Sequence, residues 1–228
     1  MAIADINRYL DHAVLKPELT RQEAIAAIQL GVDYRVRTVC VRPCDIELAV
    51  DMCRGTDSEV SCVLAFPHGC TSSVVKGDEA RRYIAAGTRE IDMVANYGFI
   101  RSGMWDEVVA DIRAVTDVAR PAGVLVKVIL ETAYLTLDEI KRAVACAIEA
   151  QADFVKTSTG FAPEGATEEK VKAMLEAAQG RIKVKAAGGI RDRARAERFI
   201  EMGVARIGNG YTSTKAICEG VGRSDADY

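Results

Sequence analysis

Short runs rich in β-branched residues alternate with longer stretches of helical periodicity along nearly the whole chain, and this alternation restricts the fold more than any other feature. Eight runs are predicted as strands: Leu10–Leu15, Thr38–Arg42, Val60–Phe66, Glu90–Ala95, Val124–Glu131, Asp153–Thr157, Ile182–Ala187 and Ala205–Gly208. Eight strand–helix units in 228 residues is the number of a (β/α)8 barrel. The alternative, a doubly wound open sheet, usually carries GxGxxG after its first strand, and none follows the first strand here. We therefore predict the α/β class and a single-domain (β/α)8 TIM barrel.

Periodicity and end signals predict six helices between these strands. Two of them begin with capping-box spacing, in which Thr20 precedes Glu23 and Thr136 precedes Glu139 by three positions. The predicted helices are Thr20–Gly31, Ser73–Ala86, Trp105–Ala119, Thr136–Ala150, Thr167–Ala178 and Asp192–Met202. No segment rich in Pro, Gly and Ser divides the chain. We predict one barrel domain over residues 1–220 and a flexible C-terminal tail over residues 221–228.

Charge and cysteine content limit the classes of function. The chain has 30 Lys and Arg against 33 Asp and Glu, a net charge of −3, which argues against a nucleic-acid-binding protein because such proteins carry a basic excess. No run approaches the ~18 apolar residues of a membrane helix, and the N-terminus lacks the regions of a signal peptide. Seven scattered cysteines predict free thiols in a reducing cytoplasm. With two histidines and no CxxC pair, we predict no zinc site.

Charged residues interrupt several of the apolar strands close to their C-terminal ends, where barrels place their chemistry. Asp92 lies in the fourth strand, Lys127 in the fifth, Lys156 in the sixth and Lys185 in the seventh. Alternation puts Lys183 on the same face of its strand as Lys185. Lysines are costly to bury unless they are paired. We therefore expect several of them to converge with Asp92.

Two lysines side by side favour one particular chemistry. A lysine is a nucleophile only when neutral, and both desolvation and a second ammonium disfavour its charged form. The neutral amine would attack a carbonyl and form a Schiff base, whose iminium accepts electrons when an adjacent carbon–carbon bond breaks. This is aldolase chemistry, and it needs no metal or cofactor. The alternative is that these lysines are solvated at strand ends, or form ion pairs with Asp92 and Glu131.

Two glycine-rich loops predict an anion site. One follows the seventh strand and opens a helix, and the other follows the eighth strand. Backbone amides of such loops bind phosphate at a helix N-terminus, and in barrels these two loops are a frequent phosphate site. The alternative is that the glycines only form turns. The loop residues are Gly188, Gly189, Ile190 and Arg191 in the first, and Gly208, Asn209 and Gly210 in the second.

Motifs spread over nearly the whole chain resemble the 2-deoxyribose-5-phosphate aldolases, a family of class I aldolases. Their number and order make the resemblance specific. The two most specific are FVKTSTGF over residues 154–161 and KAAGGIR over residues 185–191. The others are DHAVLKP at 11–17, VCV at 39–41, FPHG at 66–69, EIDMV at 90–94, KVILET at 127–132 and RIG at 206–208.

The resemblance implies a (β/α)8 barrel that reversibly cleaves 2-deoxy-D-ribose 5-phosphate to D-glyceraldehyde 3-phosphate and acetaldehyde. It also implies a homo-oligomer, either a dimer or a tetramer. Lys156 matches the Schiff-base lysine, Lys185 the second lysine that perturbs it, and Asp92 the acidic proton-transfer residue. Lys127 and the C-terminal Tyr228 are candidate members of the proton relay. The family's phosphate-binding segments fall on Gly160, Gly188, Gly189, Ile190, Arg191 and Gly208.

The loop after the eighth strand departs from the family. Gly210 and Tyr211 stand where members usually carry small hydroxyl residues, which predicts a weakened phosphate site. Two alternatives therefore stay open. One is a related class I aldolase that joins acetaldehyde to a different, unphosphorylated acceptor. The other is a non-catalytic barrel that binds a sugar phosphate, although binding alone does not require two crowded lysines.

Overall fold

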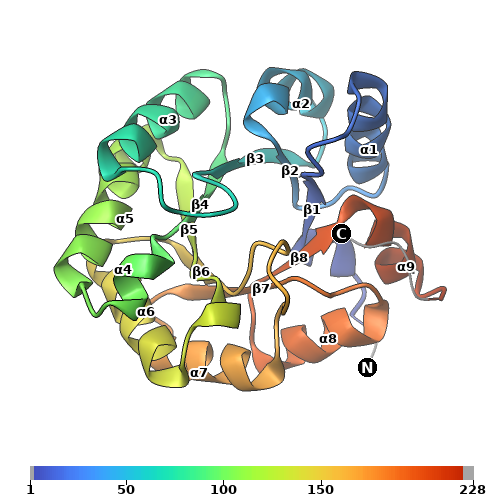
Figure 1. Cartoon of the computed structure of the whole chain (residues 1–228). Coiled ribbons are helices and arrows are strands. Elements are labelled where there is room, and N and C mark those ends of the chain that lie inside the picture. Colours follow the sequence, from blue (N-terminus) through green and yellow to red (C-terminus); the bar gives the residue numbers. More distant parts are fainter. Residues whose placement is uncertain (1–2, 223–228) are drawn as a thin grey trace.

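The computed structural model describes residues 3–222, which form a closed barrel of eight parallel strands in chain order (Figure 1). Each strand pairs with the next, and the eighth closes the ring on the first, where Asp11 lies opposite Gly208. The predicted (β/α)8 TIM barrel is confirmed. The strands are β1 (Leu10–Val14), β2 (Thr38–Val41), β3 (Glu59–Leu64), β4 (Glu90–Val94), β5 (Leu125–Ile129), β6 (Phe154–Lys156), β7 (Lys183–Ala187) and β8 (Arg206–Gly210).

Helices follow the strands and form the outer ring (Figure 1). The α5 helix has its predicted bounds, and the starts of α1, α6, α7 and α8 differ because the predicted ranges included the capping residue. None of the helices within residues 3–222 is long and apolar enough to cross a bilayer. The helices are α1 (Arg21–Asp33), α2 (Ile46–Cys53), α3 (Ser73–Ala85), α4 (Tyr97–Arg101), α5 (Trp105–Ala119), α6 (Leu137–Glu149), α7 (Glu168–Ala178), α8 (Arg193–Met202) and α9 (Thr214–Glu219).

The short helices α2, α4 and α9 were not among the predicted elements. The α2 helix shows why, because its start lacks the capping-box spacing that marks α1 and α6. Asp45 occupies the N-cap position of α2 but makes no capping hydrogen bond there. Its carboxylate instead accepts from Arg42 at 2.7 Å and from Arg21 at 3.3 Å. The α4 and α9 helices have five and six residues, too few to show a helical period.

Six strands end earlier than predicted: β1, β2, β4 and β6 by one residue, and β3 and β5 by two. After β3 and β5 the backbone turns out of the extended conformation. Ala65 after β3 has φ +51° and Glu131 after β5 has φ +54°, both in the left-handed region. The predicted ends at Phe66 and Glu131 are therefore wrong by two residues each. β8 in contrast continues to Gly210, two residues beyond its predicted end.

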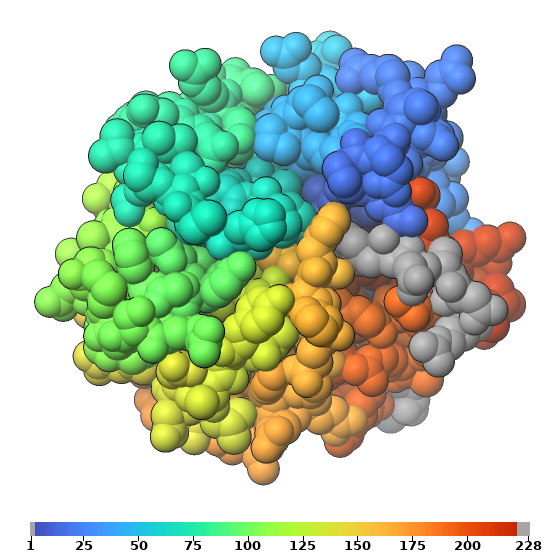
Figure 2. Space-filling view, viewed as in Figure 1, coloured from blue at the N-terminus to red at the C-terminus, as the bar shows by residue number. Residues whose placement is uncertain are grey.

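The barrel has two buried regions of different character, one apolar and one charged. Apolar side chains fill the layer between strands and helices, as on α6, where Ile140, Val144 and Ala147 are fully buried. Inside the ring of strands, charged residues replace them. At the mouth of the barrel, the loop after β3 meets the loop after β6, and the Phe66 and Phe161 rings lie 5.3 Å apart. Figure 2 shows these loops as teal against orange near the centre of the view.

Candidate active site

A cluster of seven charged side chains occupies the inside of the barrel. Hydrogen bonds and ion pairs join all of them, and each residue is at most 6% exposed. With every group ionised, four cations would face three anions, an excess of one positive charge. The cluster therefore favours one neutral lysine. We call it the interior cluster: Asp11, Glu90, Asp92, Lys127, Lys156, Lys185 and Arg206.

Asp92 lies at the centre of this cluster and contacts all three lysines. Lys127 Nζ donates to Asp92 Oδ1 at 2.8 Å. Lys156 Nζ and Lys185 Nζ both donate to Oδ2, at 2.9 and 2.7 Å. The register explains this meeting, because Asp92 lies opposite Lys127 and Lys156 lies opposite Lys185 on neighbouring strands. The predicted convergence of lysines on Asp92 is confirmed.

The same surroundings shift the pKa values of the two facing lysines in opposite directions. Burial disfavours the charged form of both. At Lys185, the carboxylates of Asp11 and Asp92 outweigh burial and raise the pKa above its ordinary value. At Lys156, burial outweighs the attraction of Asp92, the charge of Lys185 adds to the effect, and the pKa is lowered. Lys156 is therefore the lysine that most readily becomes neutral.

Access to the mouth singles out the same residue. The Lys156 side chain is 4% exposed, against 1% for Lys185 and none for Lys127. The pKa of Lys127 is raised well above its ordinary value, because Asp11, Asp92 and Glu90 outweigh its burial. Lys127 is thus a fixed cation beneath the site. The pKa of Asp92 is lowered well below its ordinary value, because the three lysines outweigh burial.

Three members of the interior cluster are absent from the predicted site residues. Asp11 Oδ2 accepts from Lys185 at 2.5 Å, and Arg206 bridges Asp11 at 2.5 Å and Glu90 at 2.7 Å. All three lie in motifs that the sequence shows. Alternation within their strands would have placed them inside the barrel, since Glu90 shares a face with Asp92.

Two further charged side chains, one in β7 and one just after β5, lie outside the cluster. Lys183 is exposed at the start of β7, and its Nζ lies 5.3 Å from the centre of the Phe154 ring. Of the two ion-pair partners that the alternative named, Asp92 does pair with all three lysines of the interior cluster, whereas no ion pair is found at Glu131 among the described residues. Glu131 Oε2 accepts hydrogen bonds from the backbone N–H and the hydroxyl of Thr159 instead.

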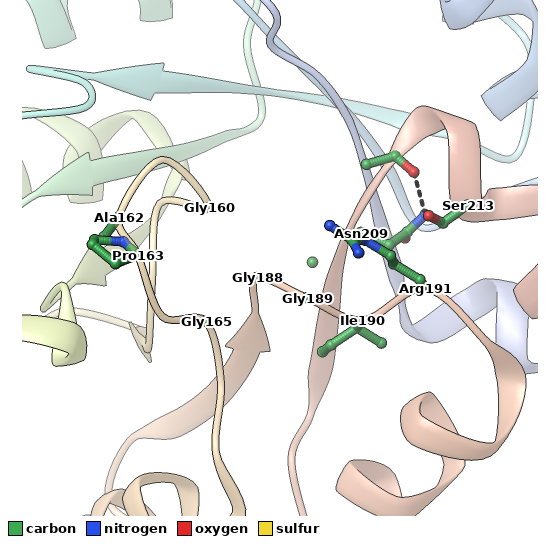
Figure 3. A pocket seen from close by; sticks show the side chains of 12 residues that line it. Gly160, Ala162, Pro163, Gly165, Gly188, Gly189, Ile190, Arg191, Asn209 and Ser213 are labelled. Atoms are coloured by element: carbon green, nitrogen blue, oxygen red, sulfur yellow. Dashed lines mark hydrogen bonds between the residues drawn. The ribbon is translucent and has the colours of Figure 1, made fainter. Parts of the chain in front are cut away.

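A cavity of about 140 Å³ lies beside the interior cluster, at the ends of β6, β7 and β8. The residues predicted for the anion site, which are Gly160 and those of the two glycine-rich loops, all line it. Figure 3 shows Gly160 and Pro163 on one side and Ile190, Arg191 and Asn209 on the other, with Gly188 and Gly189 between them. Its full lining is Gly160, Ala162, Pro163, Gly165, Gly188, Gly189, Ile190, Arg191, Gly208, Asn209, Gly210 and Ser213. We call it the glycine cavity.

The glycines of this cavity are required by geometry. Gly188 and Gly189 have φ of +86° and +73°, which residues with a Cβ rarely adopt. A Cβ on Gly165 would lie 2.2 Å from the Gly188 carbonyl oxygen. A Cβ on Gly208 would lie 3.1 Å from Lys185 Cε. Gly208, which lines the cavity, therefore lies directly beside the Lys185 side chain.

Ser213 is a cavity residue that was not among the predicted ones. It is 3% exposed and comes from the short turn η5 (Tyr211–Ser213) between β8 and α9. Gly210 lines the cavity as well, whereas Tyr211 does not and packs against the apolar core. The departure from the family motif thus leaves one serine hydroxyl at this cavity.

Known proteins share the motifs and the fold. A family model described as DeoC/LacD family aldolase matches residues 9–220. The chain belongs to this family. The deoxyribose-phosphate aldolase of Natranaerobius thermophilus is 41% identical over 208 residues, 91% of this chain and 94% of that protein. That of Thermococcus gammatolerans is 43% identical over 218 residues, 95% and 96% of the two chains.

Solved structures of family members agree with the barrel. The aldolase QR15 has a TM-score of 0.89 at 40% identity, covering 96% of each chain. The tetrameric deoxyribose phosphate aldolase of Aeropyrum pernix has a TM-score of 0.86 at 27% identity, covering 95% of this chain and 90% of that one. The resemblance predicted from the motifs is confirmed. Tyr228, predicted as a relay residue, lies outside the described residues.

Proposed function

We propose that this family member is a class I deoxyribose-phosphate aldolase, which reversibly cleaves 2-deoxy-D-ribose 5-phosphate to D-glyceraldehyde 3-phosphate and acetaldehyde. One observation carries the proposal: two lysines share one oxygen of Asp92 while their pKa values move apart. This arrangement supplies a nucleophile and a proton donor side by side. The relatives of 41–43% identity, all named deoxyribose-phosphate aldolase, support it.

The first step forms the Schiff base. The neutral amine of Lys156 adds to the aldehyde carbon of the open-chain sugar and gives a carbinolamine. Lys185, whose pKa is raised, gives a proton to the carbinolamine hydroxyl, which leaves as water. The positive charge then resides on the Lys156 iminium, close to the ionised Asp92.

The second step breaks the bond between C2 and C3. The proton of the C3 hydroxyl passes through water to the pair formed by Asp92 and Lys185, and the bond electrons move into the iminium. D-glyceraldehyde 3-phosphate leaves, and an enamine stays on Lys156. Protonation of its terminal carbon restores an iminium, and water hydrolyses this to acetaldehyde and free amine. All protons exchange with groups that already lie within hydrogen-bond distance of one another.

The glycine cavity holds the phosphate in this proposal. Its size suits a single anion, and backbone amides at Gly188 and Gly189 lie before the N-terminus of α8. The positive end of the helix dipole favours a dianion there. Because Gly208 of the cavity lies beside Lys185, which shares Asp92 with Lys156, phosphate and reacting carbon would lie at the two ends of one five-carbon sugar.

A second candidate keeps the Schiff base and changes the acceptor. It is a class I aldolase that joins acetaldehyde to an unphosphorylated aldehyde, and the observation in its favour is Gly210 and Tyr211 in place of hydroxyl residues. Ser213 at the cavity favours the phosphorylated substrate. A homo-oligomer and a cytoplasmic location also belong to the proposal. The tetrameric Aeropyrum pernix relative supports the former, and the free thiols of the cysteines support the latter.

Borohydride reduction in the presence of acetaldehyde tests the proposed function. We expect an ethyl group on Lys156, located by mass spectrometry of peptides, and cleavage of 2-deoxyribose 5-phosphate that a chelator does not reduce. Lys183→Ala is the matched control, because Lys183 is an exposed lysine near the cluster and should leave both results unchanged. An unlabelled Lys156 in protein that still binds phosphate esters would instead indicate a binding barrel.

A further inference from the structure

Four buried side-chain atoms within residues 3–222 have no hydrogen-bond partner, and all lie at the C-terminal end of the barrel strands. They are Glu131 Oε1, Thr132 Oγ1, Ser158 Oγ and Asn209 Oδ1. A buried hydroxyl without a partner is destabilising, so its persistence points to a ligand that supplies the partner. Of the four residues, Ser158 has the placement that specifies what this ligand group is.

Ser158 lies between the Schiff-base lysine and the glycine cavity. It follows Lys156 by two residues and precedes Gly160, which lines the cavity, by two. A Cβ placed on Gly188, another lining residue, would lie 3.4 Å from Ser158 Cβ. The Ser158 residue is fully buried. Ser158 therefore belongs to the segment that joins the Schiff-base lysine to the lining of the cavity, and its Cβ lies next to Gly188.

The polar groups next to Ser158 are already engaged. Thr157 Oγ1 donates to the Ala187 carbonyl and accepts from the Ala187 N–H, both at 3.0 Å. The Thr159 hydroxyl donates to Glu131. Lys156 Nζ is held by Asp92. None of these groups bonds the Ser158 hydroxyl, which is therefore available to a substrate.

We propose that Ser158 is a specificity-determining residue that binds the acceptor aldehyde's hydroxyl, the one on the carbon between the reacting carbonyl and the phosphate-bearing carbon. This inference rests on the proposed function, which fixes the two ends of the substrate at Lys156 and the glycine cavity. Between these ends, D-glyceraldehyde 3-phosphate carries one hydroxyl group. Ser158 can donate to it or accept from it.

The test compares two acceptors in the synthesis direction with acetaldehyde as donor. One is D-glyceraldehyde 3-phosphate, and the other is 3-oxopropyl phosphate, which lacks only the hydroxyl. Ser158→Ala should lower kcat/KM for the first about tenfold and leave that for the second within about twofold, since a hydrogen bond between neutral groups has about that value. Ser213→Ala is the matched control, because a serine at the phosphate end should affect both acceptors alike.

Three results would overturn the inference. They are an equal loss for both acceptors, no loss for either, and an unaltered preference for D- over L-glyceraldehyde 3-phosphate in Ser158→Ala. If that variant does not fold, Ser158→Cys keeps nearly the same side-chain volume and replaces the hydroxyl with a weaker donor. The ratio of its kcat/KM losses for the two acceptors then decides. Failure of the proposed function is separate, since the unaltered protein would then neither trap acetaldehyde on Lys156 nor join it to either acceptor, and this inference would fall with it.

Discussion

The interior cluster and the glycine cavity are adjacent but are built in opposite ways. In the cluster, charged side chains fix one another's ionisation, so that Lys156 has a lowered pKa while Lys185 keeps its proton. In the cavity, half of the lining residues are glycines, which offer only backbone atoms. Changes in the cluster should alter the chemical step for any substrate. Changes in the cavity should alter binding of phosphorylated substrates only.

The largest expected effect comes from removing the nucleophile. Lys156→Ala should abolish cleavage and synthesis for phosphorylated and unphosphorylated substrates alike, because no other lysine within residues 3–222 combines access to the mouth with a lowered pKa. Turnover is measured in both directions, with borohydride trapping in parallel. Substantial activity with Lys185 now labelled would reverse the roles of the two lysines.

Lys185→Leu should have the second-largest effect on activity, and it should change the pH profile of kcat/KM. The substitution removes a positive charge, so Asp92 attracts the proton of Lys156 more strongly and the Lys156 pKa rises. The neutral amine is the active form, so the acidic limb of the kcat/KM profile should move to higher pH. Activity at neutral pH should fall by orders of magnitude and return in part under alkaline conditions. An unchanged limb would show that the two lysines are not coupled.

The contrast between the two regions also explains what the sequence could predict. Lys156, Lys185 and Asp92 were recognisable because charges inside apolar strands are costly and therefore informative. Alternation and strand order then bring them together, as the register of Lys156 opposite Lys185 shows. Asp11, Glu90 and Arg206 were missed. The contact of Asp11 with Lys185 crosses from β1 to β7 and depends on closure of the barrel. Pairing across a closed ring is not a local property of sequence.

The cavity was predictable in outline because its glycines have a local cause. Gly188 needs its positive φ, and the loop sequence shows this. Ser213 could not be predicted in the same way. It reaches the cavity because η5 turns back after β8, and three residues of 3-10 helix have no periodic signature. The early end of β5 has a similar origin, because Glu131 adopts a left-handed backbone that its residue type does not announce.

Ser213→Ala tests whether the glycine cavity affects phosphate binding independently of the chemistry in the interior cluster. A hydrogen bond to a charged phosphate contributes about 1.5–3 kcal/mol. Loss of this hydroxyl should therefore raise KM for 2-deoxyribose 5-phosphate about tenfold or more and leave kcat nearly constant. Unphosphorylated 2-deoxyribose is the control substrate, and its kcat/KM should not change. A parallel loss for both sugars would mean that Ser213 supports the structure rather than the phosphate.

The smallest expected effect concerns the altered loop after β8. The structure predicts different results for substitutions at the two altered positions. Family members carry small hydroxyl residues where this chain has Gly210 and Tyr211, but only Gly210 lines the cavity. Gly210→Ser should add a donor and lower KM for the phosphorylated sugar a few-fold, less than Ser213→Ala raises it, because one hydroxyl is already in place. Its φ of −63° lets a side chain be added without backbone strain.

Tyr211→Ser should bring no such gain and should lower stability, since the ring packs on the core. KM for both sugars and thermal unfolding of each single variant measure this. If Tyr211→Ser alone improved phosphate binding, the phosphate would have to extend beyond the glycine cavity toward η5, and the boundary drawn between the two regions would be wrong.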